Sequence, residues 1–310
     1  MRVLVTGGGG FLGRRIVARL ATRGDDVVAI DTVYASGLAD LVNVTLKTGD
    51  ITDVADVTEV FASVRFDAVV HCAAIVGVTA SIKNPRKIVE VNVQGSLNVL
   101  EAMRASGVKR MIHISSNEVY GDTETAAIDE DHPLRPQLPY GISKAAVEQF
   151  GRTYRDLHGL ECINLRGSWV YAPDFPRPRL PNLLVTKLCR GEAVHLAQGG
   201  DSVMDYVHAD DVVDAVLAAL DRSIHAYDTY NVGFGIGTSL AQVVDLIREI
   251  LPAAEISVGP GRYEFEPGLP MRVQAALDIS RATRELKYAP KYDLRRGVED
   301  LIRAARATAG

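Results

Sequence analysis

The glycine-rich stretch at residues 7–13, "GGGGFLG", constrains the fold of this chain more than any other feature. The apolar β-branched residues 3–5 before it are typical of a buried strand, and residues 11–24 after it have helical spacing with Gly24 as a stop signal. A strand, a glycine turn and a helix in this order bring backbone N–H groups and the positive helix end to an anion. We therefore expect a dinucleotide pyrophosphate to contact Gly7, Gly10, Phe11, Leu12 and Gly13.

An acidic residue follows the second predicted strand at the spacing that ribose recognition requires. Asp31 lies 18 residues after Gly13 and directly follows the apolar run at residues 27–30. A carboxylate at this position accepts hydrogen bonds from the adenosine ribose hydroxyls and repels a 2′-phosphate. The next residues, "TVYAS", contain no arginine, so we predict NAD rather than NADP as the cofactor. The glycines fit two versions of the motif, one starting at Gly7 and one at Gly8.

Short apolar runs alternate with segments of helical period through the first half of the chain. The runs lie at residues 3–5, 27–30, 69–74, 111–115 and 162–165. One of the intervening segments, residues 88–107, has the pattern of a helix that ends at Gly107. Parallel strands joined by crossover helices produce this alternation, which predicts an α/β fold with a doubly wound parallel sheet of the Rossmann type.

Four prolines interrupt the alternation after about residue 168, namely Pro173, Pro176, Pro178 and Pro181. Such a cluster excludes regular structure and marks a loop or a boundary. We predict an NAD-binding domain at residues 1–167, with return segments near 207–235, and a smaller C-terminal substrate-binding domain at residues 168–206 and 236–310. Further helices are expected at residues 210–220, 240–250 and 294–305.

Composition limits the partners of the chain. A net charge of −5 and a pI near 5.8 provide no basic field for a nucleic acid. No apolar run approaches the roughly 18 residues of a membrane span, and no leader-like segment precedes the first strand, so we expect a cytoplasmic protein without a membrane partner. Cys72, Cys162 and Cys189 are isolated and the histidines show no ligand spacing, so we predict no metal site.

A tyrosine and lysine pair is the first candidate for reacting groups. Of the eleven tyrosines, only Tyr140 has a lysine four residues later, Lys144, which places both side chains on one helix face. A free phenol has a pKa of about 10, so it needs a cation beside it to serve as a base near neutrality. The serine-rich stretch "SSNEVYG" at residues 115–121 ends a predicted strand, at the edge where α/β sheets bind ligands. We expect the two segments to form one site.

These segments together resemble an extended short-chain dehydrogenase/reductase of the NAD-dependent sugar epimerase/dehydratase type. The resemblance runs nearly end to end and rests on "TGGGGFLG", "GDITD", "HCAA", "VNVQGSLNVLEA", "ISSNEVYG", "YGISK", "LRGSWVYAP", "DYVHADDVVDAV" and "LDISRATRELKY". It implies that Tyr140 is the general base for a substrate hydroxyl, that Lys144 holds the ribose and lowers the Tyr140 pKa, and that Ser116 hydrogen-bonds the same hydroxyl.

The same resemblance implies further contacts and an assembly. Cofactor contacts are implied for Asp50, Ile51, Ala73, Ala74 and Asn92. A homodimer is implied, joined through the helix after Pro85 and the helix that carries Tyr140 and Lys144.

The reaction is less constrained, because members of such a family share the first oxidation and differ in the fate of the ketone. Glu118 stands where members that eliminate or decarboxylate often carry an acid, so it is a further candidate catalytic residue. Dehydratases pair that Glu with an Asp acid, and here the partner is Asn117, which has no titratable proton to donate. Asn117 therefore argues against dehydration.

The substrate half departs from the sugar-nucleotide pattern. Trp169 replaces an amide that contacts the substrate in relatives. Met204, and Phe265 with Glu266, stand where two arginines are expected to bind the diphosphate. Replacements for these arginines are sought among Arg177, Arg179, Arg262 and Arg272, of which Arg262 is the nearest to Phe265 in sequence.

Two functions follow from these observations. We favour an NAD-dependent epimerase-type enzyme that oxidises a hydroxyl of a nucleotide sugar with tightly bound NAD, as a 4-epimerase does. The alternative is an NAD-dependent dehydrogenase of a small polyol, sugar acid or hydroxy acid, which the missing arginines and Trp169 support. A non-catalytic NAD-binding sensor is disfavoured, because Ser116, Tyr140 and Lys144 are all present.

Overall fold

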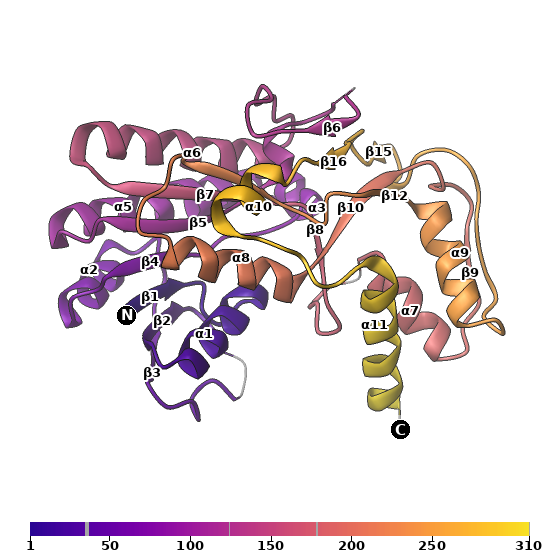
Figure 1. The fold of residues 1–310 in the computed structure, drawn as a ribbon, viewed down its shortest axis with the longest axis horizontal. Coiled ribbons are helices and arrows are strands. Elements are labelled where there is room, and N and C mark those ends of the chain that lie inside the picture. Colours follow the sequence, from indigo (N-terminus) through magenta and orange to yellow (C-terminus); the bar gives the residue numbers. More distant parts are fainter. Residues whose placement is uncertain (35–36, 124, 178, 310) are drawn as a thin grey trace.

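A seven-stranded parallel sheet forms the centre of the first half of the molecule (Figure 1). The computed structural model describes residues 1–34, 37–123, 125–177 and 179–309. The strand order is β11-β7-β5-β4-β1-β2-β3, and every neighbouring pair is parallel. The strands are β1 (Arg2–Thr6), β2 (Asp26–Asp31), β3 (Val44–Thr48), β4 (Ala68–His71), β5 (Arg110–Ser116), β7 (Glu161–Gly167) and β11 (Thr229–Val232). The predicted doubly wound sheet is confirmed.

Five of these strands were predicted and two were not. The run at residues 69–74 ends earlier than expected, because β4 stops at His71 and residues 72–74 leave the sheet. β3 is only partly buried and includes Lys47, so it lacks the continuous apolar run by which the inner strands were recognised. β11 is four residues long and follows a loop, far in sequence from the strand it joins.

Helices cover both faces of this sheet because its strands are apolar on both faces. Along β1, the side chains of Val3 and Val5 point to one face and that of Leu4 to the other, as strand geometry requires. The first face packs against α1 (Phe11–Arg23), α8 (Ala209–Asp221) and α10 (Ser280–Leu286). The second packs against α2 (Val54–Ser63), α5 (Gly95–Ser106) and α6 (Pro139–His158), as Figure 1 shows.

A second core lies beside the sheet and belongs mainly to the later part of the chain. Its three-stranded sheet has the order β12-β10-β8, from β12 (Gly237–Ser239), β10 (Val203–His208) and β8 (Trp169–Tyr171). Three helices surround it: α7 (Asn182–Cys189), α9 (Leu240–Ile250) and α11 (Leu294–Ala309). Two-stranded pairs complete this half, namely β9 (Val194–Leu196) with β13 (Ile256–Val258), β14 (Glu264–Glu266) with β15 (Leu269–Pro270), and β6 (Ala127–Ile128) with β16 (Ala276–Leu277).

The predicted helices at residues 210–220, 240–250 and 294–305 are confirmed as α8, α9 and α11. The predicted helix at residues 88–107 is interrupted. It contains the end of α4 (Pro85–Ile88), a π-helical segment η1 (Val89–Gln94) and α5, and it ends at Gly107 with φ 78° as expected. The described part of the proline-rich segment forms a loop between β8 and α7, and Pro178 lies outside the described residues.

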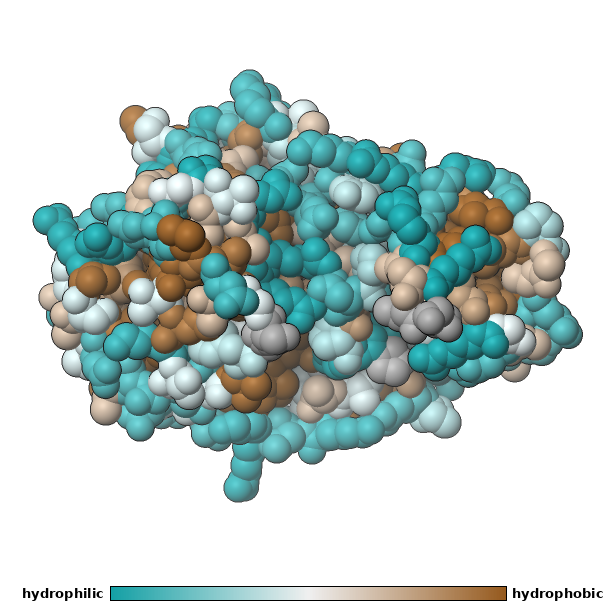
Figure 2. Space-filling view, turned by 90° about the horizontal axis from the view of Figure 1, so that it is seen from below, coloured by the Kyte–Doolittle hydropathy of each residue, from teal (hydrophilic) through white to brown (hydrophobic). Residues whose placement is uncertain are grey.

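The surface is mixed in character. Figure 2 shows one face, on which apolar groups alternate with hydrophilic side chains. Among the described residues, no helix is both long enough and apolar enough to cross a membrane. The same residues contain no group of three or more side chains placed to hold a metal ion.

Candidate active site

A cavity of about 510 Å³ lies at the carboxyl end of the parallel sheet, where α/β folds bind their ligands. One wall consists of the glycine turn after β1, the segment after β4, the end of β5 and the start of α6. The opposite wall consists of β8, the loop after it and the β14 region. The predicted residues that line the cavity are Gly7, Gly10, Phe11, Leu12, Gly13, Ala74, Ser116, Glu118, Tyr140 and Lys144.

The glycine turn has no room for side chains. A Cβ on Gly7 would lie 2.6 Å from the Ala73 nitrogen, and Gly7 has φ 69°, a conformation that favours glycine. A Cβ on Gly13 would lie 1.9 Å from the Gly7 carbonyl oxygen. Gly8 is equally confined, because its Cβ would lie 2.6 Å from that of Ala29, so both versions of the motif contain glycines that the packing requires. The turn therefore brings bare backbone to the N-terminus of α1, as a pyrophosphate site requires.

Asp31 at the end of β2 braces the glycine turn. Its Oδ2 accepts a hydrogen bond of 3.0 Å from the Gly9 nitrogen, and its Oδ1 accepts one of 2.7 Å from the Thr32 nitrogen. The carboxylate is thereby fixed beside the turn, where it would accept hydrogen bonds from the adenosine ribose of a bound NAD. Asp31 itself is not among the residues that line the described cavity.

Four other predicted cofactor residues also lie outside the cavity lining. The backbone of Ala73 packs against Gly7, and Asp50 accepts a hydrogen bond of 2.8 Å from the Thr52 nitrogen. Ile51 is buried against α5. Asn92, in η1, uses its amide to bind the Ile75 nitrogen and oxygen at 2.8 and 3.0 Å. Asn92 thus fixes the backbone of the loop after β4 without lining the cavity itself.

Tyr140 and Lys144 lie one helical turn apart at the start of α6, and their exposed fractions are 7% and 3%. Burial raises the pKa of Tyr140 to about 12, a hydrogen bond from Ser116 opposes this rise, and the charge of Glu118 adds to it. Burial lowers the pKa of Lys144 to about 8. The Lys144 ammonium donates a hydrogen bond of 2.7 Å to the Ile114 carbonyl. The strand end and the helix therefore meet as predicted.

The stretch after β5 turns at once into a short 3₁₀ segment, η2 (Asn117–Val119). The Ser116 Oγ caps it by accepting a hydrogen bond of 3.2 Å from the Glu118 nitrogen. Burial raises the pKa of Glu118, while the charges of Arg179 and Arg272 oppose the rise. Asn117 lines the cavity, but its amide nitrogen already donates to the Gln274 Oε1 at 2.8 Å.

The substrate wall is aromatic at the positions where the sugar-nucleotide pattern is broken. Trp169 stacks on Phe265 with ring centroids 6.1 Å apart, and its indole nitrogen donates to the Leu180 carbonyl at 2.7 Å. Met204 is buried. Glu266 forms an ion pair of 2.6 Å with Lys83. Neither expected diphosphate position therefore provides a cation.

Of the four replacement arginines, two reach the cavity. Arg177 and Arg179 line it from the loop after β8. Arg262, which sequence proximity favoured, donates to the Met271 carbonyl, and Arg272 pairs with Asp122 at 3.4 Å. Neither Arg262 nor Arg272 is among the residues that line the cavity. Proximity to Phe265 in sequence does not translate into a place in the cavity, because the guanidinium turns to the backbone of its own hairpin.

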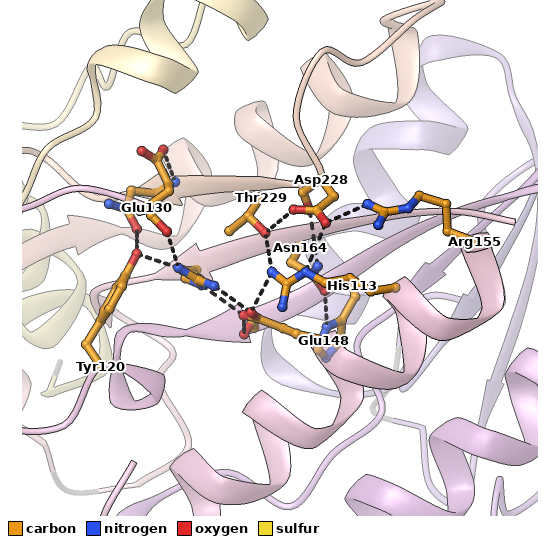
Figure 3. A network of polar contacts seen from close by, with 12 residues as sticks. His113, Tyr120, Glu130, Glu148, Arg155, Asn164, Asp228 and Thr229 are labelled. Carbon is orange, nitrogen blue, oxygen red and sulfur yellow. Dashed lines mark hydrogen bonds and ion pairs between the residues drawn. The ribbon is translucent and has the colours of Figure 1, made fainter. Parts of the chain in front are cut away.

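A buried polar network lies behind the site (Figure 3). Glu148 and Arg166 are 0% and 1% exposed, and Arg166 donates to both Glu148 oxygens at 3.0 and 2.6 Å. Ser115, the neighbour of Ser116, donates to Glu148 at 2.6 Å. Arg166 also donates to the Tyr120 hydroxyl at 2.8 Å. The network thus connects α6, the end of β5 and the segment after η2, which are the three elements that hold the candidate reacting groups.

Several lining residues carried no sequence signal. They lie in the loop after β4, the loop after β8 and the β14 hairpin, and they include Val76, Gly77, Phe175 and Tyr263. Loops of this kind have no hydrophobic period, and their approach to the sheet depends on packing between distant segments. The place of Glu148 in the network of Figure 3 could have been predicted from sequence. Glu148 follows Lys144 by four residues, which places both side chains on the same face of a helix.

The chain belongs to the NAD dependent epimerase/dehydratase family, whose model matches residues 3–233. It is 32% identical over 315 residues to the UDP-glucose 4-epimerase of Mycolicibacterium smegmatis, with 97% of both chains covered. It is 30% identical over 325 residues to the dTDP-glucose 4,6-dehydratase of an Actinoplanes species, with 99% of this chain and 98% of the relative covered.

Solved structures agree with this assignment. A UDP-glucose 4-epimerase from Thermotoga maritima with UDP-glucose matches with a TM-score of 0.89 and 30% identity over 100% of both chains. A UDP-glucuronic acid 4-epimerase from Bacillus cereus, in complex with UDP-glucuronic acid and NAD, matches with a TM-score of 0.85 and 25% identity over 99% of this chain and 100% of that one. The chain is therefore an NAD-dependent enzyme of the extended short-chain dehydrogenase/reductase type, similar to nucleotide-sugar epimerases.

Proposed function

We propose that this enzyme is a 4-epimerase of a nucleotide sugar and that Tyr140, Lys144 and Ser116 carry its chemistry. The observation that supports the proposal most directly is the single cavity shared by Ser116, Tyr140 and the glycine turn. NAD supplies the hydride acceptor of the reaction. Lys144 would hold its ribose, and the glycine turn and Asp31 would hold its pyrophosphate and adenosine ribose.

In this proposal Tyr140 would remove the proton of the hydroxyl on the substrate carbon that is oxidised, and bound NAD would supply the hydride acceptor for that carbon. Ser116 hydrogen-bonds the hydroxyl oxygen and orients it. Once the other face of the ketone is turned toward the hydride donor, Tyr140 would return the proton to the oxygen. The sequence of steps is redox-neutral and inverts one carbon.

The high pKa of Tyr140 has to be lowered for this chemistry. Burial keeps it at about 12, and the charges of Arg179 and Arg177 act in the opposite direction. A positively charged nicotinamide and the Lys144 ammonium would add to that effect. Lys144 has to keep its proton to do so, although burial lowers its pKa to about 8.

Glu118 has a proposed role in positioning or protonating the sugar. Burial raises its pKa, which favours the protonated acid at a given pH. An acid at this place could move a proton on the neighbouring carbon, as elimination requires. The amide of Asn117, already bonded to Gln274, cannot act as its acidic partner. We therefore retain epimerisation and not dehydration.

One observation favours the alternative of a dehydrogenase for a smaller substrate. Trp169 and Phe265 stack against each other and line the cavity, so part of its wall is aromatic and carries no charge that would bind a diphosphate. Released ketone and stoichiometric NADH would be the signature of this activity, whereas an epimerase regenerates its cofactor within each turnover.

The first test mixes purified protein and NAD with UDP-glucose, with UDP-glucuronic acid and with a panel of free polyols, sugar acids and hydroxy acids. Product from a nucleotide sugar without net NADH supports the proposal. Accumulation of NADH with a small substrate alone overturns it in favour of a dehydrogenase. The Tyr140→Phe variant should lose at least about 100-fold in kcat while still binding NAD, because base catalysis contributes 10²–10⁴-fold. Activity within tenfold of wild type would remove Tyr140 from the base role.

The proposal extends to the assembly, the domains and the compartment. We place a homodimer contact on η1 and α6, supported by Val89 and Ile142, which are 56% and 50% exposed. Val89→Glu should shift the sedimentation of the protein toward a monomer.

We keep the domain limits predicted above, supported by α8 and β11, which pack with the first core. Three free cysteines favour a reducing cytoplasm, which cell fractionation would test.

A further inference from the structure

Arg179 is a cation that lines the cavity and forms no ion pair with any residue that the structure describes. Its guanidinium carbon lies 4.0 Å from the centre of the Trp169 ring and 5.4 Å from that of Phe175. Within the ranges that the structure describes, no hydrogen bond or ion pair joins Arg179 to another residue. Two aromatic rings therefore hold the guanidinium in place and leave its N–H groups free for a ligand.

Arg179 lines the same cavity as Ser116, Glu118 and Tyr140. Its charge lowers the pKa of both Tyr140 and Glu118, so the guanidinium is close to the base and to the candidate acid. Burial, followed by the charge of Arg177, lowers the pKa of Arg179 itself to about 10. A desolvated cation of this kind is unfavourable until an anion joins it.

The neighbouring Arg177 is differently placed. It is exposed, and it donates to the Val76 carbonyl, so part of its hydrogen-bonding capacity is already used within the chain. The two positions where relatives place diphosphate-binding arginines hold the buried Met204 and the Glu266 that pairs with Lys83. Arg179 is consequently the half-buried cation that an anionic group near the reacting carbon would meet.

We propose that Arg179 binds a carboxylate of the substrate, borne on the carbon next to the one that is oxidised. The substrate is then a nucleotide-linked sugar acid, and not a neutral hexose. A guanidinium and a carboxylate form two parallel N–H···O bonds, which would fix the sugar ring against Tyr140 and Ser116. This inference rests on the proposed epimerase function and specifies its substrate class.

The test compares two substrates that differ only at this position, UDP-glucuronic acid and UDP-glucose. The wild-type enzyme with NAD is expected to prefer UDP-glucuronic acid by at least about tenfold in kcat/KM, since hydrogen bonds to charged groups are among the strong ones. Arg179→Gln should reduce kcat/KM for UDP-glucuronic acid by about 10- to 100-fold and change that for UDP-glucose by less than about threefold. Arg179→Lys, which keeps the charge but loses the fork, should restore part of the preference.

Arg262→Gln provides the matched control, because Arg262 is an arginine of the same half of the molecule that does not line the cavity. It should leave the ratio of the two substrates unchanged. Binding of NAD to every variant, measured by fluorescence, verifies that each is folded.

Three results would overturn the inference. An equal loss for both substrates in Arg179→Gln would assign Arg179 to the diphosphate that they share. A wild-type preference for UDP-glucose that Arg179→Gln leaves unaltered would also exclude the carboxylate, while the epimerase function would stand. If NAD is bound but neither nucleotide sugar is converted, the epimerase proposal itself fails, and the carboxylate proposal fails with it.

Discussion

Two arginines that pack on aromatic rings, the buried Arg166 and the half-buried Arg179, differ in how this fold compensates their charge. Arg166 and Arg179 each pack on an aromatic ring, at 4.8 Å from Tyr120 and 4.0 Å from Trp169. Burial acts to lower the pKa of Arg166, but the hydrogen bonds and charge of Glu148 outweigh it, so that pKa is raised. For Arg179, burial and the charge of Arg177 outweigh the charges of Tyr140 and Glu118, which act in the opposite direction, so its pKa falls to about 10.

Arg166 is a charge that pairs within the fold, whereas Arg179 is a charge that is available to bind a ligand. The network around Arg166 is complete within the chain, since its donors meet the Glu148 carboxylate, the Tyr120 hydroxyl and the Glu130 carbonyl. The cavity instead contains several groups whose pKa burial moves toward neutrality, namely Lys144, Arg179 and Glu118. Such perturbed groups gather at functional sites because the protein leaves their partners to the ligand.

The largest expected effect breaks the complete network. Glu148→Leu should lower the free energy of unfolding by about 3–5 kcal/mol, because it leaves the Arg166 charge buried without a partner. Urea denaturation would measure the loss. The double variant Glu148→Leu with Arg166→Met should recover most of it, since two apolar side chains replace the pair. A loss below about 1 kcal/mol in the single variant would remove the distinction between the two arginines.

A smaller effect on the free energy of unfolding is expected for Lys144 in the cavity, and it depends on pH. Lys144 has a pKa of about 8 in the fold against 10.5 in the unfolded chain, so its burial as an ammonium destabilises the protein below pH 8. Lys144→Met should therefore raise the free energy of unfolding at pH 7 by about 2 kcal/mol, after the loss of one hydrogen bond.

The sign of the pH dependence follows from linkage. Between pH 8 and 10.5 the unfolded chain holds more protons at Lys144 than the native one, so wild-type stability rises with pH in this window relative to the variant. Urea denaturation of cofactor-free protein at pH 7 and at pH 9.5 would measure this effect. The free energy of unfolding of Lys144→Met should exceed that of the wild type by less at pH 9.5 than at pH 7. An advantage that stays constant over this interval would show that Lys144 keeps an ordinary pKa.

The ring beneath Arg179 should have a weaker influence still. Trp169→Leu removes the cation–π contact, which contributes about 0.5–2 kcal/mol, so the preference for a carboxylate-bearing substrate should fall about two- to thirtyfold. Trp169→Phe retains an aromatic face and should lose less. Competition kinetics between UDP-glucuronic acid and UDP-glucose would measure both variants. Equal ratios in wild type and Trp169→Leu would mean that the indole does not hold the guanidinium.

The smallest effect is expected on the surface. Lys87 and Glu90 form an exposed ion pair of 2.8 Å in which both side chains are more than two-fifths solvent-accessible. Glu90→Gln should change the free energy of unfolding by less than about 0.5 kcal/mol, because solvent screens the pair. A loss as large as that of Glu148→Leu would indicate that burial does not decide the contribution of an ion pair in this protein.

Much of the sheet and of its cofactor edge could be predicted because the relevant signals are local. The glycine turn, Asp31, and the pair Tyr140 and Lys144 each depend on a few neighbouring residues whose spacing determines their geometry. The serine at the end of β5 could be placed beside them because parallel strands end at one edge of the sheet.

The substrate side was less predictable for a physical reason. Arg179 reaches the reacting groups through a proline-rich loop whose path depends on packing against Trp169 and Phe175. Neither a hydrophobic period nor a helix-capping residue in the sequence indicates such packing. The π-helical turn that contains Asn92 was likewise missed, because its apolar pattern resembles that of an ordinary helix. Arg262, the candidate nearest to Phe265 in sequence, does not line the cavity, because distance along the chain does not report distance in space.

Helix α6 has one more consequence, which concerns what substitutions and insertions it can accept. Tyr140, Lys144 and Glu148 are spaced at four-residue intervals on this helix, so one side connects the cavity to the buried network. One additional residue between positions 140 and 148 would rotate everything beyond it by about 100° around the helix axis. An insertion or deletion between these positions would therefore separate the cavity from the buried network, even where each substitution on this helix alone is accepted.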